Sequence, residues 1–212
     1  MTTHETFFFR DLPAWQTFEE LVVPTLLASR RAGLRIWSAA CSDGQEPYSI
    51  AMLLEERWPA IAAASTIVAT DVSAPAIERA SAGVYSVFDV NRGLGAARLL
   101  RHFDRASTGG FRVRRPLRER VTWQVASILD GGPRGAAFDV VFCRNVLIYF
   151  NDADRLSVLR SLSAKTKPDG FVALGVSEVV SAKSIGPGWY QNGLFARAMT
   201  DPRPDPAALL VR

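Results

Sequence analysis

Carboxylates stand at the ends of two apolar segments of this chain, where they could hold a cationic or hydroxylated ligand. Glu46 follows the small-residue stretch AACSDG at residues 39–44, which joins an apolar run at residues 34–40 to a helical pattern. Small side chains in such a turn let a ligand approach the backbone N–H groups at the start of a helix, where the helix dipole favours an anion. This turn is therefore expected to border a ligand site.

Asp71 ends the second apolar run, residues 65–70, roughly 27 positions after Gly44. An acidic residue about 20 or more positions beyond the first turn is placed to hold the ribose hydroxyls of an adenosine-containing cofactor. Aspartate also caps helices well, so a purely structural role for Asp71 is the alternative.

The first turn lacks the G-x-G-x-x-G pattern that lets a pyrophosphate approach the backbone, because it holds only Gly44. NAD and FAD are therefore disfavoured. S-adenosylmethionine has no phosphate and tolerates such a turn, since its methionyl carboxylate can still use the exposed N–H groups. Glu46 could attract the ammonium or sulfonium of that molecule. The alternative is that Glu46 only interacts favourably with the helix dipole.

A further polar group follows residues 138–143, FDVVFC, which have the composition of a buried strand. This run delivers Arg144 and Asn145 to the same expected sheet edge, and Tyr149 follows at once. Buried Asn and Tyr side chains need hydrogen-bond partners, which a polar cofactor or substrate would supply. The alternative is a turn whose polar groups satisfy one another.

Apolar periodicity predicts alternating strands and helices, the pattern of a doubly wound α/β domain that binds ligands beyond the carboxyl ends of its strands. The expected helices cover residues 13–28, 47–58, 74–82, 96–103 and 153–164. The expected strands cover residues 34–40, 65–70, 111–114, 121–127, 138–143, 171–176 and 194–199.

Local signals set several boundaries. Pro59 is expected to end the second helix, Ser73 to cap the third, and residues 168–170 to turn into the next strand. The alternation breaks at residues 84–120, which we interpret as a small insertion of antiparallel strands with an edge strand at 111–114. We expect one domain over residues 1–200, followed by a loose Pro-rich tail at residues 201–212.

Composition restricts the function classes. The 212 residues carry a formal net charge of +4, with 48% hydrophobic and 22% charged residues, which are ordinary globular values. Cys41 and Cys143 show no C-x-x-C spacing and are expected to be reduced thiols of a cytoplasmic protein. No apolar run reaches the ~20 residues of a membrane span. No cluster has metal-ligand spacing, so we expect no metal, and His102 is expected to be structural or exposed.

Five motifs then occur in a distinctive order. They are HETFFFR at residues 4–10, WSAACSDGQEPYSIAM at 37–52, ATDVS at 69–73, AGVY at 82–85 and FCRNVLIYF at 142–150. Together they closely resemble the S-adenosylmethionine-binding domain of CheR-type chemotaxis receptor glutamate O-methyltransferases. The resemblance implies a class I methyltransferase fold with a small antiparallel insertion. We find no counterpart of the all-helical domain that commonly precedes this domain in the family.

The resemblance also implies roles for residues of the first three motifs. Thr6 and Arg10 would line the cofactor and methyl-transfer pocket, with Arg10 orienting the incoming carboxylate. His4 stands where the family usually has Asn, and its imidazole can still donate one hydrogen bond to the cofactor. Glu46 and Asp71 would hold the methionyl and ribose ends of the cofactor.

Further roles follow for the later part of the chain. Asn145 and Val146 would lie beside the cofactor, as would Ser127 and Ile128 at the end of the preceding strand. Ser127 stands where the family usually has Asn. Tyr149 resembles the tyrosine placed near the sulfonium, so Tyr149 and Arg10 are the expected catalytic residues.

The implied reaction is methyl transfer from S-adenosylmethionine to glutamate side chains on the cytoplasmic helices of methyl-accepting chemotaxis receptors. An ionised glutamate needs no general base. A monomer is expected, and the basic run from Arg112 to Arg120 is either a solvated face or a contact for an acidic receptor. The alternatives are a methyltransferase of another protein or small molecule, and a cofactor-binding regulatory module. A nucleic-acid methyltransferase is disfavoured, because no N-P-P-Y-like motif is present.

Overall fold

The computed structural model describes residues 6–29, 31–178, 189–192 and 195–198 of the chain. His4 and the expected tail at residues 201–212 lie outside the described residues. Among the described residues, no helix combines the length and apolar character needed to cross a membrane.

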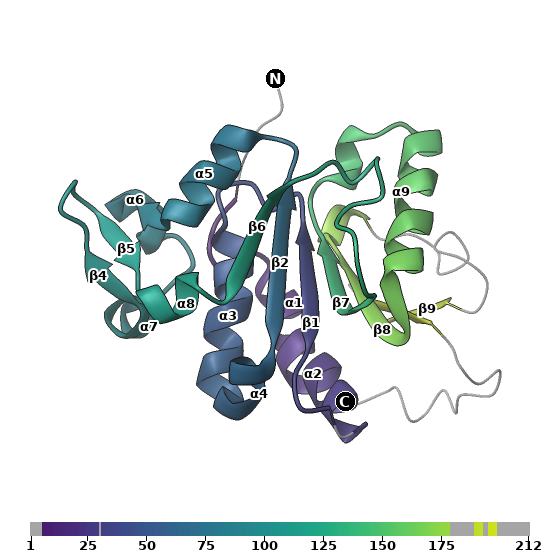
Figure 1. Cartoon of the computed structure of the whole chain (residues 1–212), viewed down its shortest axis with the longest axis horizontal. Coiled ribbons are helices and arrows are strands. Elements are labelled where there is room, and N and C mark those ends of the chain that lie inside the picture. The colour runs from purple at the N-terminus through teal and green to yellow at the C-terminus, as the bar shows by residue number, and fades with distance from the viewer. Residues whose placement is uncertain (1–5, 30, 179–188, 193–194, 199–212) are drawn as a thin grey trace.

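A twisted sheet forms the centre of the molecule (Figure 1). Within the described residues it has seven strands in the order β6-β2-β1-β7-β8-β10-β9. The strands are β1 (Arg35–Ala39), β2 (Thr66–Asp71), β6 (Val121–Val125), β7 (Phe138–Cys143), β8 (Thr166–Leu174), β9 (Trp189–Asn192) and β10 (Phe195–Ala198). Neighbours from β6 to β8 pair in parallel, whereas β10 is antiparallel to both β8 and β9. The strand order reverses between β1 and β7, which is where a doubly wound sheet binds ligands.

Helices cover both faces of this sheet. They are α1 (Leu12–Thr17), the π-helical turn η1 (Phe18–Val22), α2 (Val23–Ala28), α3 (Gln45–Arg57), α4 (Pro59–Ala64), α5 (Ala74–Ala82) and α9 (Asp152–Lys165). Successive side chains of β1 and β7 point to opposite faces, so Ile36 joins one apolar cluster and Trp37 the other. The first cluster packs against α1 to α3, and the second packs against α9.

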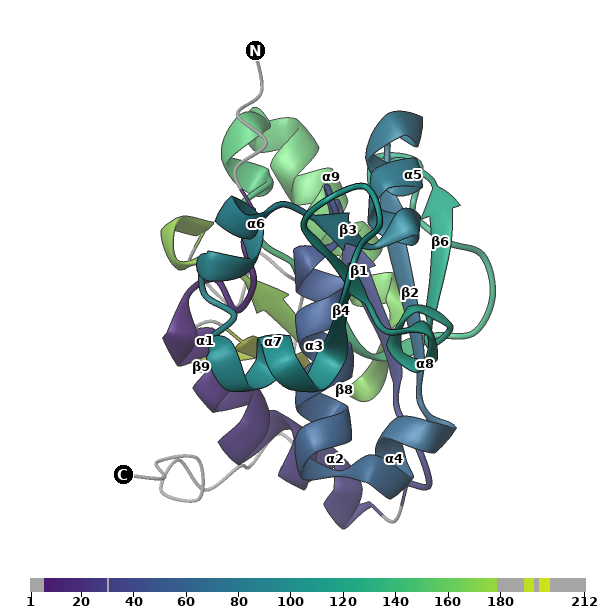
Figure 2. The same cartoon turned by 90° about the vertical axis from the view of Figure 1, so that its left-hand side faces the viewer.

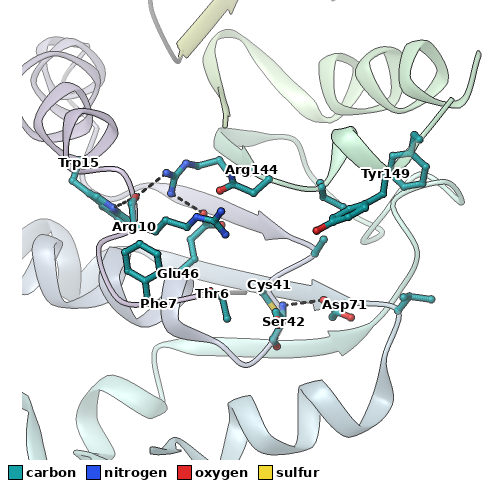
Figure 3. A pocket seen from close by; sticks show the side chains of 15 residues that line it. Thr6, Phe7, Arg10, Trp15, Cys41, Ser42, Glu46, Asp71, Arg144 and Tyr149 are labelled. Atoms are coloured by element: carbon teal, nitrogen blue, oxygen red, sulfur yellow. Dashed lines mark hydrogen bonds and ion pairs between the residues drawn. The ribbon is translucent and has the colours of Figure 1, made fainter. Parts of the chain in front are cut away.

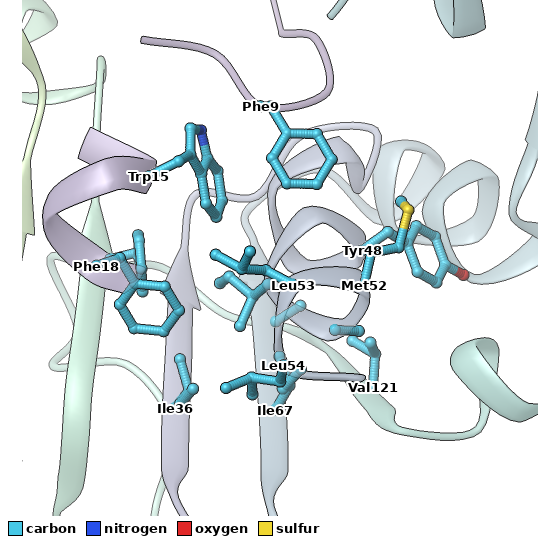
Figure 4. Packing of buried hydrophobic residues seen from close by; sticks show 14 of the residues in the cluster. Phe9, Trp15, Phe18, Ile36, Tyr48, Met52, Leu53, Leu54, Ile67 and Val121 are labelled. Carbon is cyan, nitrogen blue, oxygen red and sulfur yellow. The ribbon is translucent and has the colours of Figure 1, made fainter. Parts of the chain in front are cut away.

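The segment before α1 is anchored in the first cluster (Figure 4). Phe9 and Trp15 form an edge-to-face pair with ring centroids 5.2 Å apart, and Trp15 stacks on Phe142 of β7. The Phe9 amide also donates a hydrogen bond to Ser49 Oγ in α3. These contacts fix the chain around Arg10 against the sheet.

A second, smaller sheet lies to one side of α3, as Figures 1 and 2 show. Its three strands have the antiparallel order β3-β5-β4, formed by β3 (Val84–Tyr85), β4 (Phe103–Arg105) and β5 (Phe111–Val113). Three short helices accompany it: α6 (Val87–Asn91), α7 (Ala96–His102) and α8 (Arg115–Arg118). The expected doubly wound α/β fold with a small antiparallel insertion is therefore confirmed.

The insertion is fixed to the end of α3 by a polar cluster. Glu56 accepts hydrogen bonds from Arg98 Nη2 at 2.9 Å and lies 2.9 Å from His102 Nε2. The Arg98 guanidinium also lies over the Phe9 ring, 3.7 Å from its centroid. His102 was expected to be either structural or exposed. It is 2% exposed, so the structural alternative is confirmed.

Several expected boundaries are wrong. Residues 111–113 form the central strand of the small sheet rather than an edge strand. The end of the second helix is as expected, since α3 stops at Arg57 before Pro59, and Pro59 then begins the separate helix α4. Residues 168–170 lie within β8, where the register with β7 is irregular. The single helix expected at 13–28 is interrupted by the π-helical turn η1. This turn lies directly before α2, and Pro24 in α2 lacks a backbone N–H donor.

Candidate active site

A cavity of about 370 Å³ opens at the carboxyl ends of β1, β2 and β7 (Figure 3). This volume is in the usual range for pockets that bind small molecules. The cavity is lined by Thr6, Phe7, Arg10, Trp15, Ala40, Cys41, Ser42, Glu46, Asp71, Val72, Arg144, Asn145, Val146, Tyr149 and Phe150. The segments that contribute them are far apart in sequence, and the strand reversal between β1 and β7 brings them together.

Left-handed backbone is concentrated in the segments that border this cavity. Among the described residues, five that are not glycine have positive φ: Phe9, Asp11, Ala40, Ser42 and Asn145. Non-glycine residues rarely adopt this conformation, and each instance costs free energy that the surrounding structure must supply. The walls of the cavity are thus held in conformations that the chain would not adopt alone.

The first turn follows β1 and leads into α3. Its course is set by hydrogen bonds from the Cys41 amide to the Thr70 carbonyl at 2.9 Å and from the Gly44 amide to the Cys41 carbonyl at 3.0 Å. Gly44 has a φ of 89°, and a Cβ there would lie 2.8 Å from Ala80 Cβ. A larger residue would therefore displace the start of α3.

Asp71 connects this turn to the loop after β2. Its Oδ2 accepts a hydrogen bond from the Ser42 amide and its Oδ1 accepts one from the Ser73 amide, both at 2.9 Å. The residue is only 5% exposed and still lines the cavity. Asp71 therefore has a structural function in the two loops, and its expected contact with ribose hydroxyls remains a prediction.

Arg144 lines the cavity and joins three segments around it. Its Nη1 lies 3.2 Å from Glu46 Oε2, and its Nη2 donates to the Arg10 carbonyl at 2.8 Å and to Asp11 Oδ2 at 2.9 Å. The guanidinium is 2% exposed and lies over the Trp15 ring. Removing one partner of such a buried ion pair leaves an uncompensated charge, so the network fixes the loop around Arg10 to α3.

Glu46 occupies the first turn of α3 beside this arginine. Its Oε1 accepts a hydrogen bond of 2.8 Å from Ser38 Oγ in β1. Burial raises the pKa of Glu46 above its usual value, although the positive charge of Arg144 and the Ser38 hydrogen bond oppose this effect. A cation in the cavity would stabilise the ionised form.

The two expected catalytic side chains come from different loops that border the cavity. Arg10 lies near Phe7, with its guanidinium 5.7 Å from the ring centroid, and its carbonyl accepts a hydrogen bond from Trp15 Nε1. Tyr149 ends the short helix η2 (Leu147–Tyr149) and is 48% exposed. Figure 3 shows the Tyr149 hydroxyl pointing toward the cavity, across from Phe7 and Trp15.

The structure brings most of the sequence-predicted site residues together. Those that line the cavity are Thr6, Arg10, Glu46, Asp71, Asn145, Val146 and Tyr149. Their individual roles toward a ligand remain predictions.

Ser127 and Ile128 are not among the residues that line the cavity. Ile128 is 6% exposed and packs in the apolar cluster that contains Trp37, while Ser127 Oγ accepts a hydrogen bond from the Leu129 amide. Their expected contact with the cofactor, like that of His4 outside the described residues, stays a prediction.

Apart from Val146, the sequence did not predict the large apolar residues of the lining. Phe7, Trp15, Val72 and Phe150 each lie within five positions of a residue that was predicted. Their proximity to the motifs was the available signal, but apolar side chains in such a pattern are indistinguishable from core residues.

The two cysteines are free thiols and both are buried. Burial is the main cause that raises the pKa of Cys41, and that of Cys143 is raised for the same reason. A thiol that stays protonated is a poor nucleophile. Among the described residues, no group of three or more His, Cys, Asp and Glu side chains is placed to hold a metal ion.

The donor set suits S-adenosylmethionine. Glu46 and Asp71 supply negative charge for an ammonium, a sulfonium or hydroxyl groups, and the aromatic and aliphatic residues of the lining offer apolar surface for a purine. The residues of the cavity therefore fit the cofactor without the glycine-rich turn that a dinucleotide requires.

Comparisons with known proteins agree with this assignment. The family model described as "CheR methyltransferase, SAM binding domain" matches residues 4–187. Chemotaxis protein methyltransferase 1 of Pseudomonas aeruginosa is 40% identical over 186 residues, which are 85% of this chain and 68% of that protein. The chemotaxis protein methyltransferase of Vibrio parahaemolyticus is 38% identical over 181 residues, which are 84% of this chain and 66% of that protein. The chain thus spans about two thirds of the length of these relatives, and it belongs to the CheR family of S-adenosylmethionine-dependent methyltransferases.

Proposed function

We propose that this chain transfers the methyl group of S-adenosylmethionine to glutamate side chains of chemotaxis receptors. The products are a glutamyl methyl ester and S-adenosylhomocysteine. The observation that carries the proposal is the gathering of Arg10, Glu46, Asp71 and Tyr149 around one cavity at the strand reversal. Relatives named chemotaxis protein methyltransferases support the choice of acceptor.

The acceptor carboxylate requires no activation by a base, because glutamate is ionised at neutral pH. The cofactor supplies a methyl group bound to a cationic sulfonium. The negative charges of Glu46 and Asp71 favour binding of a cation at this edge of the sheet. The apolar walls lower the local dielectric, so attraction between the anionic acceptor and a cationic centre is stronger than in water.

In this proposal Arg10 orients the acceptor carboxylate. This role is supported by the positions of Arg10 and Tyr149, which both line the cavity, with Tyr149 across from Phe7. Alignment of the reacting groups can supply up to ~7 to 11 kcal/mol in favourable systems. Arg10 cannot bind the carboxylate too tightly, since stabilising the acceptor's charge equally in the ground state would not accelerate the reaction.

The partner in this proposal is the helical signalling region of a methyl-accepting receptor, which the chain would meet in the cytoplasm as a monomer. The insertion offers a polar surface for such a partner. Arg112 is exposed on β5, while Arg114 and Arg115 are exposed beside Asp104 and Glu119. Arg118 and Arg120 instead donate to the carbonyls of Val113 and Ala62, so only part of the basic run is available to a partner.

Transfer can be tested with the cofactor labelled in its methyl group and purified cytoplasmic fragments of receptors. Label should enter the receptor fragment and be released as methanol in alkali, because carboxyl methyl esters hydrolyse in base and N-methyl groups do not. A fragment whose candidate glutamates are replaced by alanine is the matched control and should stay unlabelled. Base-stable label would contradict the acceptor, and cofactor binding without any transfer would favour a regulatory module.

A further inference from the structure

Glu178 is a buried carboxylate that is not among the residues lining the cavity. It ends the short helix η3 (Val176–Glu178) that follows β8, and it is 5% exposed. Its Oε2 accepts hydrogen bonds from the amides of Asn145 at 2.7 Å and Gly175 at 2.8 Å. Its Oε1 accepts one from the Leu147 amide at 2.6 Å. Hydrogen bonds to an ionised acceptor are roughly twice as strong as those between neutral groups.

These hydrogen bonds hold the loop that forms one wall of the cavity. Asn145 has a φ of 59°, in the left-handed region, and Leu147 begins the helix that carries Tyr149. One carboxylate therefore binds the amides on both sides of Val146, which itself lines the cavity. The bonds oppose relaxation of Asn145 to a more common backbone conformation.

Gly175 provides independent support for a close fit between this loop and the end of β8. A Cβ at position 175 would lie 2.6 Å from Glu178 Oε2 and 2.9 Å from both the backbone nitrogen and Nδ2 of Asn145. Real side chains do not approach so closely, so a residue with a Cβ would separate the carboxylate from the loop.

The opposite end of β7 offers a contrast. Asp139 is also buried, and it accepts a hydrogen bond from the Arg35 amide. Its carboxylate is additionally paired with Arg31 at 3.0 Å and Lys167 at 2.9 Å. Asp139 thus stabilises the end of the sheet that is remote from the cavity, whereas Glu178 binds the amides of a cavity loop.

We propose that Glu178 is a positioning residue, which holds residues 145–149 so that Asn145 and Tyr149 stand against the bound cofactor. The inference rests on the proposed function in that the cavity is taken as the cofactor site. It does not depend on which molecule accepts the methyl group.

Glu178→Gln is the direct test. Glutamine keeps the size of the side chain, but its NH₂ group cannot accept a hydrogen bond, so at least one loop amide loses its partner. The dissociation constant for S-adenosylhomocysteine, measured by calorimetry, should rise about tenfold. Asp139→Asn is the matched control, which should lower the melting temperature and leave this dissociation constant within about twofold of wild type.

The outcomes separate this inference from the proposed function. A wild-type chain that does not bind S-adenosylhomocysteine would contradict the cofactor site itself. A folded Glu178→Gln variant with wild-type affinity would overturn only the positioning role. An equal loss of affinity in Asp139→Asn would overturn it too, because general loosening of the fold would then explain both results.

Two further measurements apply if Glu178→Gln does not fold. Gly175→Ala retains the carboxylate and should weaken binding by a similar factor, because its Cβ would displace the carboxylate from the loop. Hydrogen exchange on the wild-type chain needs no variant. The amides of Asn145 and Leu147 should exchange slowly without ligand, and fast exchange of both would refute the proposal.

Discussion

Helix α3 carries a glutamate near each end, and the two show opposite pKa shifts. Glu46 stands in the first turn beside the cavity, with Arg144 Nη1 at 3.2 Å. Glu56 stands in the last turn beside the insertion, with Arg98 Nη2 at 2.9 Å. Each glutamate therefore has an arginine partner. A comparison of their surroundings shows which other factors set the two pKa values apart.

Burial raises the pKa of Glu46, and the opposing effects of Arg144 and Ser38 do not reverse that shift. Burial also acts on Glu56, but hydrogen bonds from His102 and Arg98, together with their charges, lower its pKa to about 2. The helix dipole alone predicts the reverse order, since it favours a negative charge at the first turn. Burial therefore outweighs the dipole at Glu46, and the local partners outweigh it at Glu56.

The two arginines differ in how many of their hydrogen bonds go to the glutamate. Arg98 contacts both oxygens of Glu56, and His102 lies against one of them. Arg144 divides its donors among Glu46, Asp11 and the Arg10 carbonyl. Glu56 is thus committed to holding the insertion on α3, while Glu46 retains capacity to bind a cationic ligand. The same residue type serves folding at one end and is predicted to serve binding at the other.

The largest effect is expected from Arg10 and Tyr149, the two predicted catalytic residues at the cavity end. Arg10→Ala and Tyr149→Phe should each lower kcat for methyl transfer by roughly a hundredfold, because misplacing the reacting groups has costs of that size. The dissociation constant for the cofactor should change far less. Radiolabelled methyl transfer and calorimetry measure the two quantities separately. Equal losses in both would remove the catalytic assignment.

Glutamine at position 46 or 56 replaces one carboxylate oxygen by an NH₂ group and tests the difference between the two ends of α3. Glu46→Gln should raise the dissociation constant for S-adenosylmethionine by roughly thirtyfold, since a hydrogen bond to a charged group contributes about 1.5 to 3 kcal/mol. Glu56→Gln is the matched control on the same helix and should leave that constant almost unchanged while lowering the melting temperature. If both variants bind the cofactor equally well, the two ends do not differ as described.

The smallest effect concerns the pH dependence of stability. The pKa of Glu56 falls from 4.5 to about 2 on folding. Its ionised form therefore contributes stability that is present above pH 4.5 and is lost as the pH falls toward 2. Allowing for partial exposure, urea unfolding should show about 1 kcal/mol more loss between pH 5 and pH 3 in the wild-type chain than in Glu56→Gln. Parallel pH profiles for the two proteins would show that Glu56 has no such role.

Local signals in the sequence were sufficient where both ends of an element were marked. Helix α5 spans the predicted residues 74–82, because Ser73 accepts a hydrogen bond from the Ala76 amide and Gly83 follows in a left-handed conformation. The largely apolar run at 138–143 likewise became β7 with the predicted bounds. The central place of β5 and the irregular register of β8 could not be predicted, since both depend on which strands pair.

In the site, too, local sequence signals were sufficient for some features, whereas contacts between distant residues could not be predicted. Residues of the sequence motifs gather around one cavity, as expected for the carboxyl edge of a doubly wound sheet. The network of Arg144 was not predicted, because its partners Glu46 and Arg10 are 98 and 134 positions away in sequence. Glu178 gave no signal either, since nothing in its local sequence indicates that it binds the amides of residues 145 and 147.

The left-handed residues around the cavity bear on protein engineering. Glycine at a position such as Ala40 would adopt the same backbone conformation without steric cost, and the folded chain would gain resistance to heat. The glycine variant would also be free to leave that conformation, so the wall of the cavity would become less rigid. Selection for a higher melting temperature alone would therefore favour changes that loosen the border of the cavity.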